Sequence, residues 1–421
     1  MNNLNSKNFK NTSMIFLTAG EVPASNNLIS SQVFKLAESF QKNDIFDDVR
    51  YYGFIPLRYL FVSLLKRRFV NFSFIDKYTF NFKLFRTNFI LGGFFEFLLK
   101  GFIVKYDSQK LSKILENIES KNIIIHCRSY YATYLAIETK KICKHDSIKI
   151  VFDMRSLFPP EFPFMMGKKG KMLYGYAKEW ESYLLQNSDV SLMTTQRWIN
   201  ILISENPNPN VNLHYIPIMG LNGILEDSLL ESFNARWQNK ILPYIGSISP
   251  WHPKVMIEKV LVSLKKSIKN SRVEIITYNQ SQYSDNISIR GISHHDIEKY
   301  YSEILGLVVP GKTNENYFDS LIGSNLFSTK ASEAISMGVP LIVNEELGEL
   351  TDFVMKNKCG IVFKIVDDKI IFPYSTIDDL NSRDFWFKMT INAFKVSKEF
   401  TFKEVSKQYL HYYQGILNHE S

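Results

Sequence analysis

The chain has 421 residues, of which 45% are hydrophobic and 22% charged, a composition that excludes a disordered protein. This length exceeds what one hydrophobic core usually supports, so we expect two domains. The formal net charge of +8 indicates an anionic partner.

Cysteine usage and the absence of long apolar runs predict a soluble cytoplasmic protein. Cys127, Cys143 and Cys359 are scattered, with neither disulfide nor metal-site spacing, as in a reducing compartment. The polar N-terminal residues do not read as a signal peptide, and no run approaches the roughly 18 apolar residues of a spanning helix.

Short apolar runs alternate with longer amphipathic stretches, a pattern typical of parallel sheets with crossover helices. In the first half of the chain, strands are predicted at 13–18, 122–127, 148–153 and 189–194. In the second half, they are predicted at 242–248, 272–278, 287–292, 304–310 and 339–344. The sequence therefore predicts two α/β domains.

The Asn-, Pro- and Gly-rich stretch "SENPNPNVNLHYIPIMGLNG" separates the two halves and is typical of a linker. We place the boundary near Pro217, which gives domains at 1–216 and 217–395. A long amphipathic helical segment follows and ends the chain at 396–421.

Residues 51–105 are both basic and aromatic. They contain nine Lys or Arg residues, only two acidic residues and seventeen Phe or Tyr residues. Such a segment is suited to an anionic membrane surface, with rings in the interface and cations at the headgroups. The alternative is an amphipathic helical pair that buries its apolar side in the core. Nucleic acid is a weaker alternative, because no recognition motif accompanies the charge.

Small and polar residues follow the first predicted strand in "TAGEVPASNNLISSQV". Gly20 and its neighbours lead into a predicted helix near Ser31, whose N–H groups could face an anion. Neither a dinucleotide fingerprint nor a P-loop is present. A plain loop and helix cap explains the stretch equally well.

An arginine follows each of two predicted strands. Arg128 lies in "HCRSY" and Arg155 in "FDMRSLFPPEF", and His126 and Asp153 lie two residues earlier, on the same strand faces. A structural ion pair and a hydrogen-bonded core histidine are the plain alternatives. Two such clusters on consecutive strands favour function, because buried charge is costly.

Polar residues also follow predicted strands in the second half. "YIGSISPWHPK" contains Ser247, His252 and Lys254, and "GISHHDIEKYY" places His294 and His295 at the start of a helix. One of these two histidines could lie near a nucleobase; a helix cap and a surface position are the alternatives. Because no metal-ligand motif is present, we expect no metal site.

The stretch "SNLFSTKASEAISMGVPLIVNEELGEL" combines charge with helix signals. A helix is predicted from about Lys330 to Met337, so that its N–H groups and Lys330 could hold a phosphate. We place Glu333 on the first turn, where a carboxylate could accept two ribose hydroxyls. Gly338 as a helix cap and Glu333 as a dipole partner are the structural alternatives.

These residues resemble the signature of retaining glycosyltransferases of the GT-B fold, group 1 (family 4). "STKASEAISMGVPLIV" is similar to the family's PTK-x-x-E-(Y/A)-x-x-x-G-x-P-V-I pattern. "YIGSIS", "FDMRSLFPPE", "YIPIMG" and "GISHHDIEKYYSEILGLVVP" occur in matching order, so the likeness spans roughly residues 13 to 415.

The resemblance implies two Rossmann-like parallel-sheet domains facing a cleft, with the C-terminal helix crossing back to the first domain. It implies donor binding by the second domain, and we expect donor contacts at Gly20, Ser247, His294, Thr329, Lys330 and Glu333. Glu333 matches the second glutamate of the family's E-x7-E element, whereas the first position is Asn325. The family's Arg and Lys positions fall near Ser247 and Pro253, so Lys254 and Lys330 are the expected substitutes.

The expected catalytic residues are Lys330, Glu333, Asn325 and Lys254. Lys330, Lys254 and the helix N-termini would stabilise the departing diphosphate in place of a metal, Glu333 would accept hydrogen bonds from the donor ribose, and no cofactor is expected. Retention suggests front-face attack without a general base. His126, Arg128, Asp153 and Arg155 are expected to orient the acceptor.

The expected partners are a UDP- or GDP-sugar, a lipid-linked glycan and the anionic inner-membrane surface, without nucleic acid. The branch with "HCRS" and "FDMRS" implies bacterial surface-polysaccharide synthesis at the cytoplasmic face of the membrane. Two alternatives remain open. A nucleotide-sugar 2-epimerase needs no lipid acceptor, and a catalytically silent membrane-associated subunit is consistent with Asn325.

Overall fold

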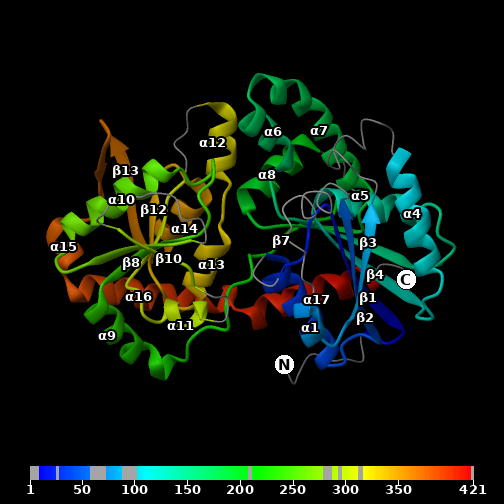
Figure 1. Ribbon diagram of the computed structural model, residues 1–421, viewed down its shortest axis with the longest axis horizontal. Helices are drawn as coiled ribbons and strands as arrows, with labels where there is room; N and C mark the ends of the chain where they lie inside the picture. The colour runs from blue at the N-terminus through cyan, green and yellow to red at the C-terminus, as the bar shows by residue number, and fades with distance from the viewer. Residues whose placement is uncertain are drawn as a thin grey trace. The chain divides into compact units, whose positions relative to one another are not determined.

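The computed structural model describes residues 9–24, 28–56, 73–87, 102–206, 211–277, 287–292, 296–311 and 316–418. The chain forms two compact units (Figure 1). Unit 1 comprises 1–194, 198–216 and 406–421, and unit 2 comprises 195–197 and 217–405. Within the described ranges, no helix combines the length and the apolar character needed to cross a membrane.

Unit 1 is built on a seven-stranded, fully parallel sheet in the order β3-β2-β1-β4-β5-β6-β7. The strands are β1 Thr12–Ala19, β2 Asp48–Pro56, β3 Asn81–Thr87, β4 Asn122–Arg128, β5 Ile148–Met154, β6 Val190–Met193 and β7 Leu213–Tyr215. In this register, Arg128 at the end of β4 lies between Thr18 of β1 and Asp153 of β5. The carboxyl ends of three central strands therefore bring polar residues together.

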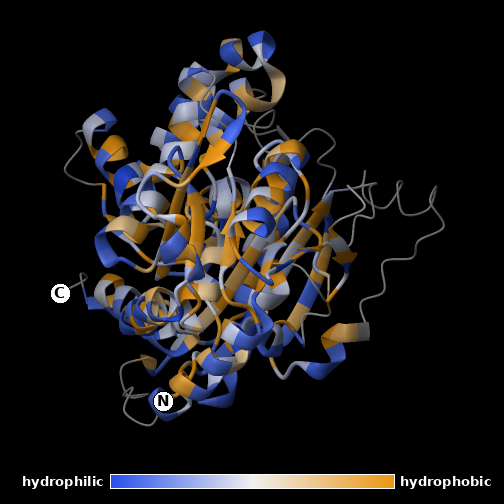
Figure 2. Ribbon diagram, turned by 90° about the vertical axis from the view of Figure 1, so that its left-hand side faces the viewer, coloured by the Kyte–Doolittle hydropathy of each residue, from blue (hydrophilic) through white to orange (hydrophobic). Residues whose placement is uncertain are grey.

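Helices cover both faces of this sheet. They are η2 Ile29–Phe34, α1 Lys35–Lys42, η3 Ser73–Lys77, α4 Phe102–Leu115, α5 Ser129–Lys140, α6 Phe158–Met166, α7 Lys168–Gln186, α8 Gln196–Glu205 and α17 Phe402–Asn418. Trp180 of α7 packs on Tyr130 and Tyr134 of α5, on one face. Tyr413 of α17 packs on Phe40 of α1, on the other. In Figure 2 the central strands carry the hydrophobic colours, as expected for a sheet covered on both faces.

Unit 2 is built on a second seven-stranded sheet in the order β10-β9-β8-β11-β12-β13-β14. The strands are β8 Ile241–Ile245, β9 Arg272–Ile276, β10 Ser288–Arg290, β11 Leu307–Val309, β12 Leu341–Asn344, β13 Gly360–Val366 and β14 Lys369–Ile371. All neighbouring strands pair in parallel except β13 and β14, which pair antiparallel at the edge.

The helices of unit 2 are η4 Glu226–Ser228, α9 Leu229–Asn239, α10 Lys254–Ser267, α11 Ile297–Tyr301, α12 Tyr317–Ser324, α13 Thr329–Ser336, α14 Gly348–Asn357, α15 Ile377–Asn381, α16 Arg383–Ser397 and η5 Lys398–Phe400. Apolar residues of α13 and α14 form one core with alternate residues of the sheet, among them Val343. Those of α10 form a second core on the opposite face, with Ile342.

The nine predicted strands are all present, although β2, β3, β7, β13 and β14 were not predicted. The alternative interpretation of 51–105 as a helical pair is wrong where that segment is described, because 51–56 belong to β2 and 81–87 form β3. The preferred interpretation, a membrane-facing surface, stays a prediction. Aromatic residues suit a pleated, half-buried surface, and Tyr51 and Phe54 are buried in the sheet. The most basic part of the segment, with Lys66, Arg67 and Arg68, lies outside the described residues.

The helical segment predicted at 396–421 contains the end of α16, a short turn and α17. α16 ends at Ser397, and α17 begins at Phe402 after the short turn η5. Unit 2 begins again at Pro217 and extends to Val405, while the rest of α17 belongs to unit 1. One continuous helix therefore contributes residues to both units.

Candidate functional site

The N-terminus of α13 in unit 2 carries the predicted donor residues Thr329, Lys330 and Glu333. The Ser328 hydroxyl caps the helix by accepting from the Ala331 N–H at 3.0 Å, and Thr329 is the first helical residue. The Lys330 ammonium contacts the Glu333 carboxylate, with 3.0 Å between Nζ and Oε2. Lys330 keeps a third of its side chain exposed, whereas Glu333 is only 3% exposed.

The prediction that Glu333 lies on the first turn of its helix is wrong. Because α13 begins at Thr329, Glu333 is its fifth residue, and the first turn contains no acidic side chain. The helix dipole acts mainly within the first turn. The carboxylate charge is therefore balanced chiefly by Lys330.

Tyr301, which the sequence did not single out, completes this cluster. Its hydroxyl donates to Glu333 Oε2 at 3.1 Å and lies 3.4 Å from the Lys330 carbonyl oxygen. Burial and the adjacent Glu333 raise the pKa of Tyr301 well above its ordinary value, so the hydroxyl keeps its proton. Among the described residues, both side-chain donors to Glu333 bind Oε2. Oε1 accepts from neither of these two side chains.

Asn325, at the first position of the E-x7-E element, ends α12. Its side-chain N–H groups donate to the Leu321 carbonyl at 2.7 Å and to the Ser324 hydroxyl at 3.1 Å. The residue is 3% exposed, and its Oδ1 is a buried acceptor for which the described residues provide no donor. The nitrogen of this amide is committed to the helix end, so only the oxygen could accept from a ligand hydroxyl.

Hydrogen bonds link the loops that follow the strands of the second sheet. His252, after β8, donates from Nδ1 to the Pro310 carbonyl after β11 at 2.5 Å. Burial lowers the pKa of His252, so its ring is neutral near pH 7. The Asn344 side chain, at the end of β12, accepts from the Gly311 N–H at 2.6 Å. Both contacts fix loops at the carboxyl ends of strands, where open α/β sheets bind ligands.

The remaining predicted donor residues fall in different settings. Ser247 is exposed, and its carbonyl accepts from the Tyr244 hydroxyl at 2.8 Å. Lys254 is partly buried and begins α10. Gly20 belongs to unit 1, follows β1 and adopts a φ of 87°, which favours glycine. His294 and His295 lie outside the described residues.

In unit 1, His126 and Asp153 form a buried pair under α17. His126 Nε2 lies 3.1 Å from Asp153 Oδ2, and His126 Nδ1 lies 2.7 Å from the Tyr413 hydroxyl oxygen. His126 is 2% exposed and Asp153 is fully buried. A neutral ring protonated at Nε2 donates to Asp153 and accepts from Tyr413, so it satisfies both contacts.

The two arginines extend this cluster. Arg155 donates to Asp153 Oδ2 at 2.7 Å and also to the Tyr409 hydroxyl. Burial would raise the pKa of Asp153, but Arg155 and His126 outweigh it and hold that pKa well below its ordinary value. Arg128 is 5% exposed and contacts Glu21 at 3.2 Å and Gln32 at 3.3 Å. His126, Asp153 and Arg155 thus form one hydrogen-bonded network across β4 and β5, whereas Arg128 bonds separately to Glu21 and Gln32.

Glu161 is a further ionisable group near the end of β5 that the sequence did not single out. It lies in the first turn of α6 among Phe and Pro residues. Burial raises its pKa to about 7, against the opposing effect of a hydrogen bond with Ser156. Its carboxyl group exchanges a proton near neutral pH.

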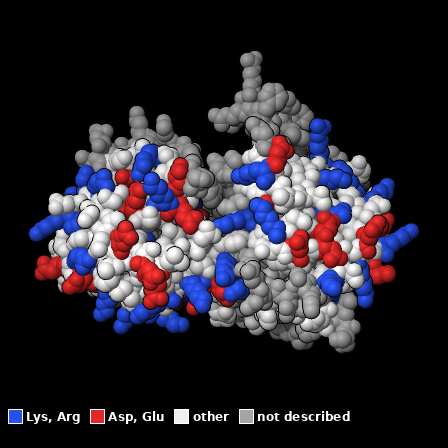
Figure 3. Space-filling view, turned by 90° about the horizontal axis from the view of Figure 1, so that it is seen from below, with Lys and Arg blue, Asp and Glu red and all other residues white. Residues whose placement is uncertain are grey.

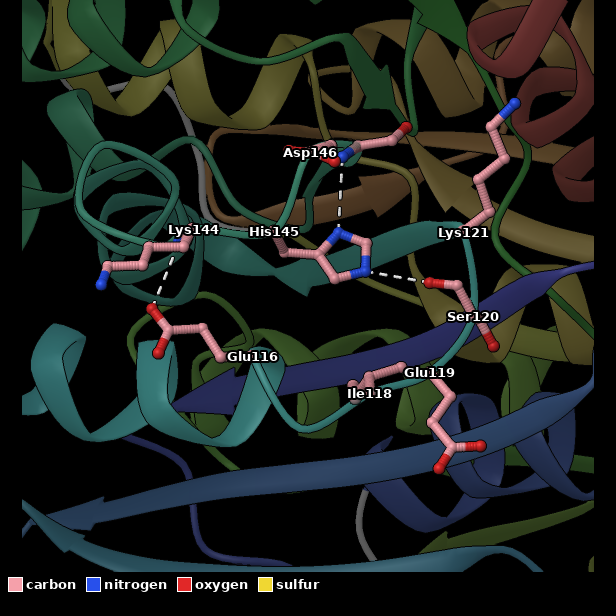
Figure 4. A pocket seen from close by; sticks show the side chains of 9 residues that line it. Glu116, Ile118, Glu119, Ser120, Lys121, Lys144, His145 and Asp146 are labelled. Atoms are coloured by element: carbon pink, nitrogen blue, oxygen red, sulfur yellow. Dashed lines mark hydrogen bonds between the residues drawn. The ribbon is translucent and has the colours of Figure 1, made fainter.

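A cavity of about 650 Å³ lies at the amino ends of β4 and β5, away from the carboxyl ends described above (Figure 4). Its lining residues are Glu116, Ile118, Glu119, Ser120, Lys121, Lys144, His145, Asp146 and Ser147. His145 Nε2 contacts the Ser120 carbonyl at 2.9 Å, and Glu116 accepts from the Lys144 N–H at 3.2 Å. The cavity lies at the amino ends of these strands, so we do not assign it to the candidate site.

In the part of the chain that the structure describes, no group of three or more His, Cys, Asp or Glu side chains is arranged to hold a metal ion. No protein-family model matches the chain, and no curated protein sequence matches it.

Solved structures resemble the chain over both units. Sucrose-phosphate synthase from Thermosynechococcus elongatus has 13% identity and a TM-score of 0.65, covering 97% of this chain and 99% of its own. A glycosyltransferase from Rickettsia africae has 13% identity and a TM-score of 0.61, with coverages of 96% and 98%. A UDP-forming trehalose-phosphate synthase from Burkholderia xenovorans, in complex with glucose-6-phosphate, has 9% identity and a TM-score of 0.56, with coverages of 95% and 100%. At these identities the likeness concerns the fold alone, and the chain has the GT-B fold with two Rossmann-like units.

Proposed function

We propose that the protein is a glycosyltransferase that transfers a sugar from a nucleotide-sugar donor to an acceptor. The observation that carries this proposal is the cluster of Lys330, Glu333 and Tyr301 at the start of α13. It joins a cation, an oriented carboxylate and a helix N-terminus, which suit a diphosphate beside a ribose. The similarity to a UDP-forming synthase over both units supports the same reading.

In this proposal Glu333 Oε1 accepts hydrogen bonds from the donor ribose. Lys330, Lys254 and the first N–H groups of α13 face the diphosphate. Departure of the nucleotide leaves negative charge on the diphosphate and positive charge on the anomeric carbon. Fixed positive groups beside the leaving group stabilise that separation of charge and lower the barrier.

The finer assignment is a retaining enzyme of group 1 (family 4) that uses a UDP- or GDP-sugar without a metal. Front-face attack, with the leaving phosphate oxygen accepting the acceptor proton, needs no separate general base. Asn325 Oδ1 is the candidate contact to the donor sugar, because it is a buried acceptor without a donor among the described residues.

For the acceptor we propose a lipid-linked glycan of bacterial surface-polysaccharide synthesis, reached at the cytoplasmic face of the membrane. His126, Arg128, Asp153 and Arg155 lie at the carboxyl ends of β4 and β5. In this proposal the bonds among His126, Asp153 and Arg155 fix the carboxyl ends of these strands, and Arg128 lies beside them in the sheet, paired in register with Asp153.

The test is thermal unfolding with a panel of UDP, GDP, CMP and their sugar conjugates, first in EDTA and then with Mg²⁺. A ligand at about 100 times its Kd stabilises the folded state by about 2.7 kcal/mol, which raises the melting temperature measurably. We expect one nucleotide class to stabilise the wild type equally in both conditions. Stabilisation that requires Mg²⁺ would contradict the metal-independent mechanism.

Glu333→Gln should lose most of this stabilisation, because an amide accepts ribose hydroxyls less strongly than a carboxylate. The exposed Glu399, also in unit 2, gives the matched control Glu399→Gln, which should respond as the wild type does. If Glu333→Gln responds fully to the nucleotide, Glu333 does not bind the donor. If no nucleotide stabilises the wild type, the protein is better explained as a catalytically silent subunit. That explanation also agrees with Asn325, whose side-chain nitrogen bonds to the end of α12.

A further inference from the structure

The turn between α6 and α7 exposes apolar side chains. Met165 is 58% exposed and Met166 is 48% exposed at the end of α6. Met172 is 78% exposed and Tyr176 is 51% exposed on α7, one helical turn apart on one face. We call residues 165–176 the hairpin tip. Exposed apolar side chains that gather in one place mark an interaction surface.

The hairpin tip has a fixed shape rather than a loose end. Gly167 joins the two helices with a φ of 56°, and its N–H donates to the Pro163 carbonyl at 2.9 Å. A Cβ on Gly170 would lie 2.0 Å from the Phe162 carbonyl oxygen, so glycine permits the helices to touch. The methionines are therefore held outward by close helix contact.

The charged residues of the hairpin tip are all basic. Lys168, Lys169 and Lys171 are exposed beside the methionines, and no Asp or Glu occurs from residue 162 to residue 178. On the face seen in Figure 3, by contrast, Lys and Arg are interspersed with Asp and Glu. The local excess of positive charge favours an anionic partner.

The position and the side-chain chemistry of the hairpin tip select among anionic partners. In Figure 1 α6 and α7 lie beyond the carboxyl ends of the strands of their own unit. Methionine is flexible and adapts to irregular apolar surroundings, and lysine stems reach from apolar surface to polar heads. Exposed methionines with lysines beside them therefore suit a soft partner in which a layer of anionic groups covers an apolar layer.

We propose that the hairpin tip docks on an anionic lipid bilayer. Met165, Met166, Met172 and Tyr176 enter the headgroup region, while Lys168, Lys169 and Lys171 contact lipid phosphates. This surface is separate in sequence from residues 51–105. The inference does not depend on glycosyl transfer, because a chain without that activity would dock in the same way.

The experiment is co-sedimentation of the full chain with vesicles. Vesicles of phosphatidylglycerol and phosphatidylcholine are compared with vesicles of phosphatidylcholine alone, at low and high salt. We expect binding to the anionic vesicles only, weakened by salt. Each lysine near an anionic surface strengthens binding about fivefold, so replacing Lys168, Lys169 and Lys171 by Ser should weaken it by about a hundredfold.

Replacing Met165, Met166 and Met172 by Ser should weaken binding by at least about tenfold, because apolar insertion is lost. The matched control replaces Lys265, Lys266 and Lys269 of unit 2 by Ser, which removes the same charge from another exposed region. It should bind as the wild type does. Near-ultraviolet circular dichroism and the melting temperature verify that each variant is folded.

A second measurement does not depend on lowered affinity. Met172→Cys, labelled with a polarity-sensitive dye in a Cys143→Ser background, should shift its emission to the blue with anionic vesicles. An unshifted label, or tip variants that bind like the wild type, would overturn the proposal. Equal binding to both kinds of vesicle would also overturn it. Sedimentation of the wild type as a dimer that the Met replacements dissociate would assign the hairpin tip to a second copy of the chain instead.

Discussion

The contacts of Glu333 show which interactions residue spacing can predict and which it cannot. The interval between Lys330 and Glu333 predicts side chains on one helix face, and the structure places them in contact at 3.0 Å. Tyr301 lies 32 residues away in the chain, on another helix, and no local pattern pairs it with Glu333. The first two members of the cluster were therefore predictable, and the third needed the fold.

Tyr301→Phe should weaken binding of the stabilising nucleotide about five- to tenfold, because Glu333 loses a hydrogen bond that orients its carboxylate. The corresponding 2′-deoxynucleotide should lose less, since it forms fewer bonds to that carboxylate. Titration calorimetry measures both. Tyr300 donates to Glu274 at 2.8 Å in a comparable bond, so Tyr300→Phe is the control and should leave nucleotide affinity unchanged. Equal losses in the two variants would indicate a general effect on unit 2.

Glu161 should make stability depend on pH. Its pKa is about 7 in the folded protein, above its ordinary value of 4.5. The folded state therefore binds this proton more tightly than the unfolded state does. The resulting contribution to the free energy of unfolding is complete below pH 4.5 and is lost as pH rises through 7. The cost of ionising the buried group reaches up to about 3 kcal/mol.

Glu161→Gln removes this cost, so its stability relative to the wild type should increase between pH 5 and pH 8. Urea unfolding at a series of pH values gives the difference. Glu179→Gln, at an exposed position of α7, should show no such trend. A difference for Glu161→Gln that stays constant with pH would mean that the carboxyl group reaches water in the folded state.

At the scale of elements, the strands that carry the site were predictable because they are continuous apolar runs. β4, β5, β8 and β12 are buried on both faces, so their sequences stand out without alternation. β3 was missed because its side chains are mostly half-exposed at a sheet edge, and its Lys and Phe residues resemble an amphipathic helix. β14 is a three-residue edge strand, too short for periodicity to detect.

α17 has a defined role in unit 1 that its amphipathic pattern does not reveal. Tyr413→Phe leaves His126 Nδ1 buried without its partner, which should lower the free energy of unfolding by about 1–3 kcal/mol. Tyr412, the next residue back, is partly exposed and donates to the Tyr215 carbonyl at 3.0 Å. Tyr412→Phe is the control and should cost less, because water can replace its bond. Urea unfolding that ranks the two variants in the opposite order would contradict this role for Tyr413.

At the scale of the whole molecule, alternation of strands and helices predicted two α/β units, and the fold is the expected one. The polar network of unit 1 was only partly predictable. Arg128 and Asp153 stand out in the sequence as charged residues at strand ends, but the pairing register of the strands decides which residues lie beside them. The network around Asp153 also includes Tyr409 and Tyr413, which lie more than 250 residues further along the chain than their partners Arg155 and His126. Spacing identifies chemically unusual residues, whereas long-range topology decides which of them meet.

The division of the chain also bears on how the protein is made. Unit 1 is interrupted after Ile216 and resumes only at Ser406, with all but three residues of unit 2 between. On the ribosome, the strands of the first sheet emerge long before the helix that covers His126 and Asp153. Unit 2 can complete its fold while the chain is still attached to the ribosome, but unit 1 is complete only after the last turns of α17 have been synthesised. A premature stop at Ser406 would therefore leave the later-synthesised unit complete and the earlier one incomplete.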